Sequence, residues 1–279
     1  MNRAERNGKP ALALNGIGCR FGDYEAVAAS TLVVADGDEA MARALAEQLA
    51  GEFFALREQV TERGDCTVDE ALDEVMAALA DGPLVLCEQG DNHLGGSAGD
   101  GTFVLGKVVE RGIGDVAFGP IWDPMSVDIC QAVGEGERLT LRVGGKSGPE
   151  AGQPVDLQVT IRKIIPELWQ EAMGPLGRLN FGTAVWVSTA NGIDLILHST
   201  RSGTLRPNVL TDFGIDLSSK KAVIGKMWRH GEEGFRNVGR GSRIVCTPGA
   251  QTSDFATIPY RIRTGNWWPR VADPFASPE

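Results

Sequence analysis

A glycine-rich segment combines acidic, amide and hydroxyl side chains over residues 90–102. It reads Gly90-Asp91-Asn92-His93-Leu94-Gly95-Gly96-Ser97-Ala98-Gly99-Asp100-Gly101-Thr102. The preceding run 84–88 predicts a buried strand and residues 102–111 predict a helix, so the segment joins a strand to a helix. Backbone N–H groups at such a helix start can face a ligand or an acidic side chain. The alternative is a tight connection in which Asp91 and Asp100 only cap turns.

The segment does not match the common phosphate-binding loops. No Gly-Lys-Ser/Thr follows it, and it lacks the GxGxxG pattern of dinucleotide-binding loops. A nucleotide-dependent enzyme with a phosphate cradle here remains an alternative, but the loop contains no lysine and carries the acids Asp91 and Asp100.

The chain has only three histidines, His93, His198 and His230, and no HExxH motif. A catalytic zinc ion usually has three protein ligands and one open position. Asp91, His93 and His230 could be assembled into a new site of this kind. The simpler interpretation is that His93 is solvated in its polar loop and that His198 is a partly buried hydrogen-bonding residue on a strand.

Lys226 lies at the end of a predicted strand, residues 222–227, and His230 follows that strand. Lys226 could neutralise a developing oxyanion or a substrate carboxylate, whereas the alternative is a solvated lysine. His230 is a candidate active-site residue, and its alternative is a helix-cap or surface role.

The elements around these residues divide the chain into two patterns. Residues 31–35 predict a strand and residues 36–60 an amphipathic helix, and Thr67 with Glu70 forms a possible capping box for a helix to about Leu79. The strand 84–88, the helix 102–111 and the apolar run 116–121 form a βαβ unit, which implies a parallel strand pair. Asp123-Pro124 predicts the start of a short helix that ends before Gly134.

From residue 139 onward apolar residues alternate with polar ones, as in residues 155–162, which predicts an antiparallel half. Asn191-Gly192 between two apolar runs predicts a type I′ hairpin. Residues 222–227 and 242–246 predict two further strands with a poor helix between them. The expected fold is therefore α/β (mixed α+β): a βαβ unit with a glycine-rich loop, followed by an antiparallel β-rich half.

Composition narrows the classes of partner. The formal net charge is −10 and the isoelectric point is near 4.9, which gives no attraction for nucleic acid or anionic lipid. A small molecule or peptide is favoured instead. The sequence has no apolar run long enough for a membrane span and no signal-peptide core, so we expect a cytoplasmic protein. Its five cysteines are scattered singly, and we expect reduced thiols.

The order and spacing of several motifs resemble the C-terminal domain of the MlrC (microcystinase C)-like metallopeptidase family. That domain begins with a strand, an Asp-Asn-x-Gly-Gly-Gly-x-x-Gly-Asp-x-Thr loop and a helix ending in Glu-Arg-Gly. Asp-Pro and a Gly-Gly-Lys turn follow. The matching residues here are 91–102, Glu110-Arg111-Gly112, Asp123-Pro124 and Gly144-Gly145-Lys146.

Weaker matches extend the resemblance. They are Asp36-Gly37-Asp38 upstream and Lys226-Met227, His230-Gly231-Glu232, Thr247-Pro248-Gly249 and Trp268-Pro269 downstream. His93 stands where the family commonly has proline, and the glycine run is shortened to Gly95-Gly96. The resemblance implies that residues 1–82 are the end of the family's N-terminal domain and that residues 83–279 are its C-terminal domain.

The resemblance also implies an activity, a cofactor and a site. In the family, an Asp-x-His pair and a further histidine in the N-terminal domain hold zinc, which activates water for amide hydrolysis. We find no such ligands in this chain. The resemblance assigns catalytic roles to His230 and Lys226 and substrate binding to the loop, specifically Asp91, Asn92, Gly95, Gly96, Asp100 and Thr102.

Two functions follow as hypotheses. The chain is the C-terminal part of a zinc-dependent amidohydrolase or peptidase acting on small or linear peptides, completed by a missing N-terminal domain or a partner chain. It would then be inactive alone. The alternative is a catalytically inactive module that binds a small ligand or peptide. An apolar face left bare would favour a homo-oligomer.

Overall fold

The computed structural model describes residues 2–6, 9–17, 23, 29–60, 64, 66–77, 82–172, 177–263 and 265–276. The chain divides into two compact units, residues 1–63 with 255–279 and residues 64–254. The expected boundary at residue 82 concerns the domains of the family and stays a prediction.

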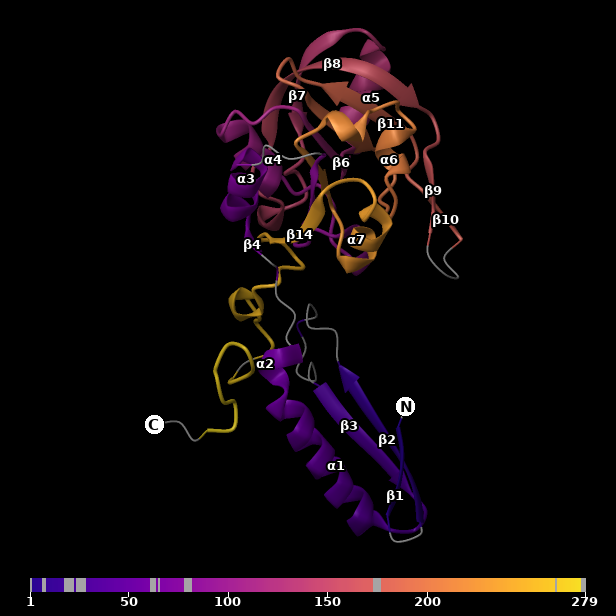
Figure 1. The fold of residues 1–279 in the computed structure, drawn as a ribbon, viewed down its shortest axis with the longest axis vertical. Helices are drawn as coiled ribbons and strands as arrows, with labels where there is room; N and C mark the ends of the chain where they lie inside the picture. Colours follow the sequence, from indigo (N-terminus) through magenta and orange to yellow (C-terminus); the bar gives the residue numbers. More distant parts are fainter. Residues whose placement is uncertain are drawn as a thin grey trace. The chain divides into compact units, whose positions relative to one another are not determined.

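The first unit is a small antiparallel sheet with one long helix. Strands β1 (Asn2–Arg6), β2 (Lys9–Ile17) and β3 (Ala29–Ala35) pair in sequence order. Helix α1 (Glu39–Ala55) lies along this sheet and is followed by α2 (Arg57–Val60), as Figure 1 shows. Asp38 caps α1 by accepting a hydrogen bond from the Met41 backbone N–H at 3.0 Å. The predicted strand and amphipathic helix are therefore confirmed.

The second unit is built on a nine-stranded mixed sheet. Six strands are parallel to one another in the order β4, β14, β5, β13, β6 and β12, and β11, β8 and β7 extend the sheet with antiparallel pairing. The bounds are β4 (Cys66–Thr67), β14 (Gly241–Cys246), β5 (Leu84–Glu88), β13 (Ala222–Gly225), β6 (Val116–Trp122), β12 (Ile193–His198), β11 (Ala184–Ser188), β8 (Val155–Ile165) and β7 (Arg138–Val143). A separate two-stranded ladder joins β9 (Trp169–Glu171) to β10 (Arg178–Asn180).

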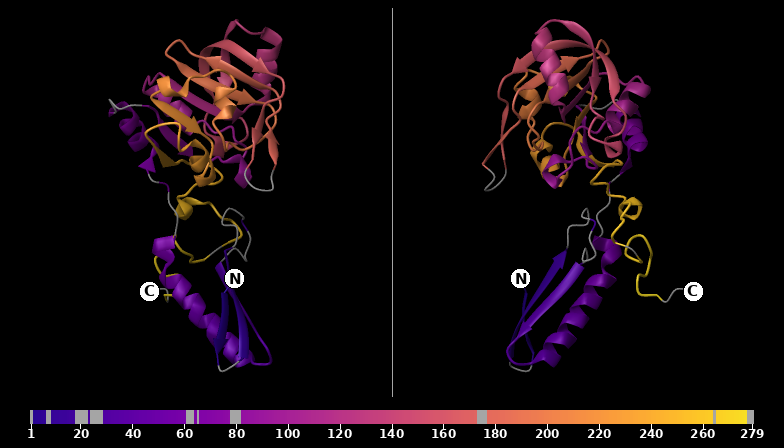
Figure 2. Two further views of the ribbon diagram at one scale, coloured as in Figure 1. Left: turned by 45° about the vertical axis from the view of Figure 1, so that its right-hand side comes forward. Right: turned by 180° about the vertical axis from the view of Figure 1, so that it is seen from behind.

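Apolar side chains cover both faces of the large sheet. Along β5, Leu84 and Leu86 join one buried cluster and Val85 and Cys87 join the other, as strand alternation requires. The first cluster contains α3 (Val68–Ala77), α4 (Phe103–Glu110) and α5 (Pro124–Val133), and the second contains α6 (Asn208–Thr211) and α7 (Arg229–Phe235). Figure 2 shows the sheet with these helices from two further sides. Short 3₁₀ turns occur at η1 (His93–Gly95), η2 (Pro149–Ala151), η4 (Leu217–Ser219) and η5 (Phe255–Thr257).

Local capping signals in the sequence form as predicted. Thr67 and Glu70 exchange hydrogen bonds at the start of α3, with the Thr67 N–H 2.8 Å from the Glu70 carboxylate. Asp123 accepts a hydrogen bond from the Ser126 N–H at 3.1 Å, and Gly134 ends α5 with a positive φ of 100°. The mixed α/β fold class and these helix positions are confirmed.

The strand order differs from the simple βαβ expectation. Strands β5 and β6 are parallel, but β13 lies between them and bonds to both. The later half is also not purely antiparallel, because β12, β13 and β14 all join the parallel part of the sheet. Periodicity identifies strands, but it carries no information about which distant strand enters the gap between two others.

The hairpin between β11 and β12 forms at the predicted place with a different turn. The Gly192 N–H donates to the Thr189 carbonyl at 3.2 Å, and Gly192 has a φ of 85°. Asn191 does not have a positive φ, so the turn is not type I′, which requires positive φ at both central residues.

The structure also bears on the expected state of the cysteines and on membrane spans. Cys66, Cys87, Cys130 and Cys246 form no disulfide bond among the described residues, and Cys19 lies outside those residues. Over the part of the chain that the structure describes, no helix is both long and apolar enough to cross a bilayer.

Candidate functional site at the carboxyl edge of the parallel strands

The carboxyl ends of the parallel strands bring together most of the predicted site residues. The loop after β5 carries residues 89–102, β13 leads directly into Lys226, and β12 ends at His198. In open α/β sheets, ligands bind outside the carboxyl ends of the strands. The parallel order therefore creates a site from segments that are distant in the sequence.

Asp91 fastens the glycine-rich loop to itself. Its carboxylate accepts hydrogen bonds from the backbone N–H of Gly99 at 2.9 Å and of Gly101 at 2.6 Å. A Cβ atom on Gly101 would lie 2.8 Å from the Asp91 carboxylate, so glycine allows this close approach. Asp91 is only 5% exposed, and it therefore shapes the loop from inside.

Asp100 and Thr102 tie the end of the loop to the predicted Gly144-Gly145-Lys146 turn and the segment after it. The Asp100 carboxylate accepts from the backbone N–H of Lys146 at 2.7 Å and of Ser147 at 2.9 Å, and it also bonds the Ser147 hydroxyl. The Thr102 hydroxyl donates to the Gln153 carbonyl at 2.6 Å. Both loop residues are buried, so they hold the backbone path of the loop.

Asn92, Gly95 and Gly96 lie at the outer part of the loop. The Asn92 side-chain oxygen accepts a hydrogen bond from the Leu94 N–H at 3.2 Å. The Asn92 backbone carbonyl accepts one from the Gln251 side-chain amide at 2.6 Å. Gly95 and Gly96 are exposed, and Gly96 is left-handed with a φ of 102°. Of the predicted substrate-binding residues, this pair of glycines is the most open to solvent.

Lys226 is fully buried between two carboxylates. Its ammonium nitrogen lies 3.1 Å from Glu88 Oε2 and 3.2 Å from Asp91 Oδ2, and both Lys226 and Glu88 are 0% exposed. This ion-pair cluster, Glu88-Asp91-Lys226, joins β5, the glycine-rich loop and the residue after β13. Isolated buried charges are very costly, so each member depends on the others.

Burial and the charges within this cluster shift the pKa values of Glu88 and Lys226. Burial raises the pKa of Glu88, and the neighbouring charge of Asp91 raises it further against the opposing effect of Lys226. Burial acts to lower the pKa of Lys226, but the charges of Glu88 and Asp91 outweigh it and the pKa is raised. Lys226 is therefore cationic. Because two carboxylates share one ammonium group, Glu88 binds a proton more readily than an ordinary glutamate does.

His93 and His198 also meet at this edge, with ring centroids 5.3 Å apart. The interpretation of His93 as a solvated side chain is wrong, because its ring packs over Gly99 and is only 6% exposed. His198 is buried and its Nδ1 lies 2.9 Å from the Thr200 carbonyl oxygen, as expected for a hydrogen-bonding strand residue.

Burial makes both histidines poor bases. It lowers the pKa of His198 to about 4 against the opposing hydrogen bond to Thr200. Burial, followed by the charges of His198, Lys226 and Arg201, holds the pKa of His93 well below its ordinary value. Both rings are therefore neutral at physiological pH.

His230 is not in this buried group. It lies in the first turn of α7 with an exposed side chain. The hypothetical metal site of Asp91, His93 and His230 does not form, because no group of three or more His, Cys, Asp or Glu side chains among the described residues could hold a metal ion. The described residues thus do not fit a catalytic zinc centre with three protein ligands.

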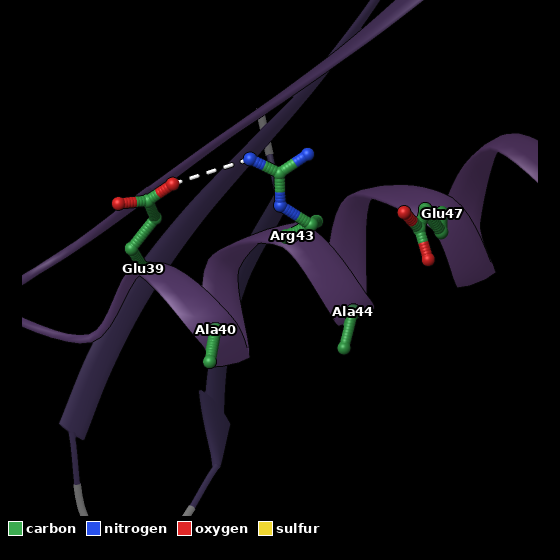
Figure 3. A pocket seen from close by; sticks show the side chains of 5 residues that line it. All are labelled: Glu39, Ala40, Arg43, Ala44 and Glu47. Carbon is green, nitrogen blue, oxygen red and sulfur yellow. Dashed lines mark hydrogen bonds and ion pairs between the residues drawn. The ribbon is translucent and has the colours of Figure 1, made fainter.

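Two hollows are lined by other residues. One is lined by Glu39, Ala40, Arg43, Ala44 and Glu47 on the solvent side of α1, where Glu39 and Arg43 form an exposed ion pair at 3.2 Å (Figure 3). The other, of about 230 Å³, lies at the amino ends of the strands beside Gly82, Asp115, Lys221 and Arg240. Neither contains a residue of the predicted site.

Sequence reasoning missed Glu88, which ends the apolar run Leu84-Val85-Leu86-Cys87. A charged residue that ends a buried strand requires a partner, and Lys226 ends the similar run Ala222-Val223-Ile224-Gly225. That shared pattern was the available signal for the pair. The contact of His93 with His198 had no such signal.

The fold and the loop at its strand edge define a mixed α/β domain of one family. The family model described as MlrC C-terminus matches residues 86–262, more than half of the chain, and the chain belongs to this family. The expected resemblance is thereby confirmed.

Two longer proteins are similar to this chain. Microcystinase C from a Sphingomonas species is 28% identical over 255 residues, which are 90% of this chain and 48% of that protein. A crystal structure of a candidate metallopeptidase from Mesorhizobium sp. BNC1 matches with a TM-score of 0.77 and 22% identity, over 93% of this chain and 51% of that one. This second likeness shows the fold. The chain spans about half the length of both relatives.

The Glu88-Asp91-Lys226 cluster predicts a strong effect of removing its cation. Lys226→Met leaves two buried carboxylates without a counter-charge, and we expect the free energy of unfolding to fall by about 3–5 kcal/mol. Adding Glu88→Gln should recover part of this loss. Lys221→Met is the matched control, since Lys221 is half exposed in its pair with Asp115 and should cost at most about 1 kcal/mol. Urea unfolding measures all four proteins, and equal losses for the two lysine variants would contradict this account.

Gly99 and Gly96 provide a matched pair of left-handed glycines, with φ of 88° and 102°. Alanine at either position incurs backbone strain of about 1–2 kcal/mol. A Cβ atom on Gly99 would also lie 1.9 Å from His93 Nε2, whereas one on Gly96 meets nothing within 4 Å. We expect Gly99→Ala to lower the free energy of unfolding by about 1–3 kcal/mol more than Gly96→Ala. Thermal and urea unfolding check this, and equal effects would refute the packing of His93 on Gly99.

His198 predicts a loss of stability on acidification. Its pKa is about 4 when folded, against 6.5 in the unfolded chain, so the stabilisation is complete above pH 6.5 and declines as the pH falls toward 4. The loss should be about 1.4 kcal/mol for each pH unit in that window. Urea unfolding at pH 7.5 and 5.5 should show a smaller pH effect in His198→Asn than in the original chain. His230→Asn, at an exposed position, is the control, and identical slopes for all three proteins would rule out this role of His198.

Proposed function

We propose that this chain is the C-terminal portion of a zinc-dependent amide hydrolase of the MlrC type, acting on small or linear peptides. Family membership and the similarity to Microcystinase C support the reaction class. The main structural support is the position of the glycine-rich loop, which the Glu88-Asp91-Lys226 cluster holds at the carboxyl edge of the parallel strands.

In this proposal the residues of this chain position the substrate. The ligands of the zinc ion come from a region outside this chain. When bound, zinc would supply an activated water and polarise the substrate amide. The described residues do not make a three-ligand centre, so no step of the reaction is assigned to a metal here.

Each predicted site residue has a separate proposed role. The exposed Gly95 and Gly96 offer their backbone carbonyls to a peptide substrate, and Asn92 holds this outer part of the loop by accepting from the Gly95 N–H. Lys226 is a positioning residue rather than a free cation, because Asp91 and Glu88 already neutralise it. His230, exposed on α7, is retained as a candidate catalytic residue that reaches the substrate only in the complete enzyme.

The alternative is a catalytically inactive module that binds a small ligand or peptide. One feature of the loop favours this alternative: the carboxylates of Asp91 and Asp100 already accept hydrogen bonds from the protein's own backbone. The loop then offers a preformed backbone surface to a ligand and no acid–base pair. Peptide binding without hydrolysis, under every condition below, would support it.

The decisive experiment combines this chain with the region encoded immediately upstream of Met1 in its source DNA. We expect that region to contain an Asp-x-His pair. The chain alone should not hydrolyse linear peptide amides, and co-expression or mixing with the upstream region in the presence of zinc should produce hydrolysis. His230→Gln should then lower kcat, whereas Arg43→Gln in the exposed hollow of α1 should not.

Two results would contradict the proposal. Amide hydrolysis by the purified chain alone would show that the catalytic residues are all present in it. Lack of hydrolysis by the reconstituted protein, with peptide binding retained, would favour the binding module instead. Product analysis by mass spectrometry distinguishes these results directly.

A further inference from the structure

A cavity of about 230 Å³ lies at the amino ends of four parallel strands, at the opposite edge of the sheet from the glycine-rich loop. Four of its lining residues come within two positions of the start of a strand: Gly82 before β5, Asp115 before β6, Lys221 before β13 and Arg240 before β14. Val75 of α3 supplies an apolar part of the lining. Because parallel strands begin at one edge, the fold gathers these residues from distant segments.

The guanidinium of Arg240 has no carboxylate partner among the described residues. Its Nη2 donates to the Glu74 backbone carbonyl at 3.3 Å, and its Nε has no hydrogen-bond partner. The Glu74 carboxylate is already occupied, because it accepts two hydrogen bonds from Arg243, both at 2.9 Å. A guanidinium has five N–H donors, and buried donors are normally satisfied. Arg240 therefore keeps its charge and most of its donors for an acceptor that the fold does not provide.

The charged residues give the cavity a positive balance in a chain whose net charge is −10. Lys220, Lys221 and Arg240 line it, with Asp115 as the one acidic lining residue. Lys221 lies 3.4 Å from Asp115 and both side chains are about half exposed, so water and other ions compete with this pair. Lys220 is engaged with Asp194 at 2.5 Å and adds charge without a free position.

The two serines that line the cavity do not add donors. Ser218 Oγ donates to the Asp216 carboxylate at 2.6 Å, and Ser219 Oγ donates to the Asp216 backbone carbonyl at 2.8 Å. Their oxygens can accept a hydrogen bond from a hydroxyl group or a water molecule. The donors available to a ligand are therefore the guanidinium of Arg240 and the ammonium of Lys221.

The backbone fixes the side of the cavity that carries the Asp115–Lys221 pair. Asp115 has a φ of 57°, the one positive value at a non-glycine position among the described residues. Its N–H donates to the Asn191 carbonyl at 3.1 Å, and its carbonyl accepts from the Lys221 N–H at 2.7 Å. Residues held in such sparsely populated conformations cluster at ligand sites. The strained backbone thus supports the same assignment as the unpaired guanidinium.

We propose that this cavity binds a small oxyanion, with Arg240 as its main hydrogen-bond donor and Lys221 as a second positive charge. A guanidinium forms strong charge-assisted hydrogen bonds with phosphate and carboxylate oxygens. The cavity is smaller than the roughly 300–1,000 Å³ of drug-sized ligand sites, so inorganic phosphate or a short carboxylic acid suits it. This site does not rest on the proposed hydrolase function.

The test titrates the full chain with sodium phosphate and, separately, with sodium succinate, both in chloride buffer of constant ionic strength. Calorimetry should show one equivalent bound, and the tighter anion identifies phosphate or carboxylate recognition. Arg240→Gln should weaken binding at least ~10-fold through the loss of charge-assisted hydrogen bonds. Arg240→Lys should restore only part of it, because lysine lacks the planar fork. Arg236→Gln is the matched control, since Arg236 pairs with Glu233 on the surface and does not line the cavity.

A second measurement needs no variant. With the tighter anion present, hydrogen–deuterium exchange of the original chain should slow in peptides covering residues 217–221 and 239–243 and stay unchanged over residues 89–102. The proposal is overturned if neither anion binds, if Arg236→Gln weakens binding as much as Arg240→Gln, or if protection appears only over residues 89–102. Anion binding by the chain without amide hydrolysis would support this site and leave the hydrolase proposal intact.

Discussion

The buried ammonium of Lys226 is the interaction on which the architecture of the strand edge depends. It lies between Glu88 at the end of β5 and Asp91 in the loop that follows, while Lys226 itself follows β13. Removing such charges from water is costly, and their mutual attraction recovers the cost only in a close arrangement. The cluster therefore requires β5 and β13 to be neighbours with their ends level, as the parallel register between Gly225 and Cys87 provides.

The glycine-rich loop inherits its shape from this cluster. Asp91, which is paired with Lys226, accepts hydrogen bonds from the N–H groups of Gly99 and Gly101. Asp100 accepts hydrogen bonds from those of Lys146 and Ser147. These acidic side chains accept hydrogen bonds from the protein's own backbone rather than from a ligand. The groups left for a substrate are the exposed backbone carbonyls of Gly95 and Gly96, because the N–H groups of both glycines bond to carbonyls of the loop itself. We therefore describe the loop as a positioning surface.

Charge and burial separate the three histidines into two kinds. His93 and His198 are neutral, buried and adjacent, whereas His230 is exposed on α7. The exposed residue suits contact with a substrate or a partner region.

Much of the local structure was predictable because its causes lie within a few residues. The Thr67–Glu70 capping box, the Asp123 cap of α5 and the strand before the glycine loop all depend on neighbours in the chain. The position of the turn at Asn191-Gly192 was predicted correctly, but the predicted turn type was wrong. A type I′ turn connects two strands through a two-residue loop, and the loop between β11 and β12 is longer than that. Family motifs, which depend on residue order, were likewise recognisable and are confirmed.

The sequence by itself determined the longer helices, most strands of the large sheet, the family and the presence of acids and glycines in one loop, whereas β1, β2, β9, β10 and α6 were not predicted. Only the tertiary structure decided that β13 enters between β5 and β6, that Lys226 meets Glu88 and Asp91, and that His93 is buried against His198. The physical reason is that capping and periodicity act between near neighbours, whereas strand order and the pairing of buried charges depend on desolvation and packing among segments far apart in the chain.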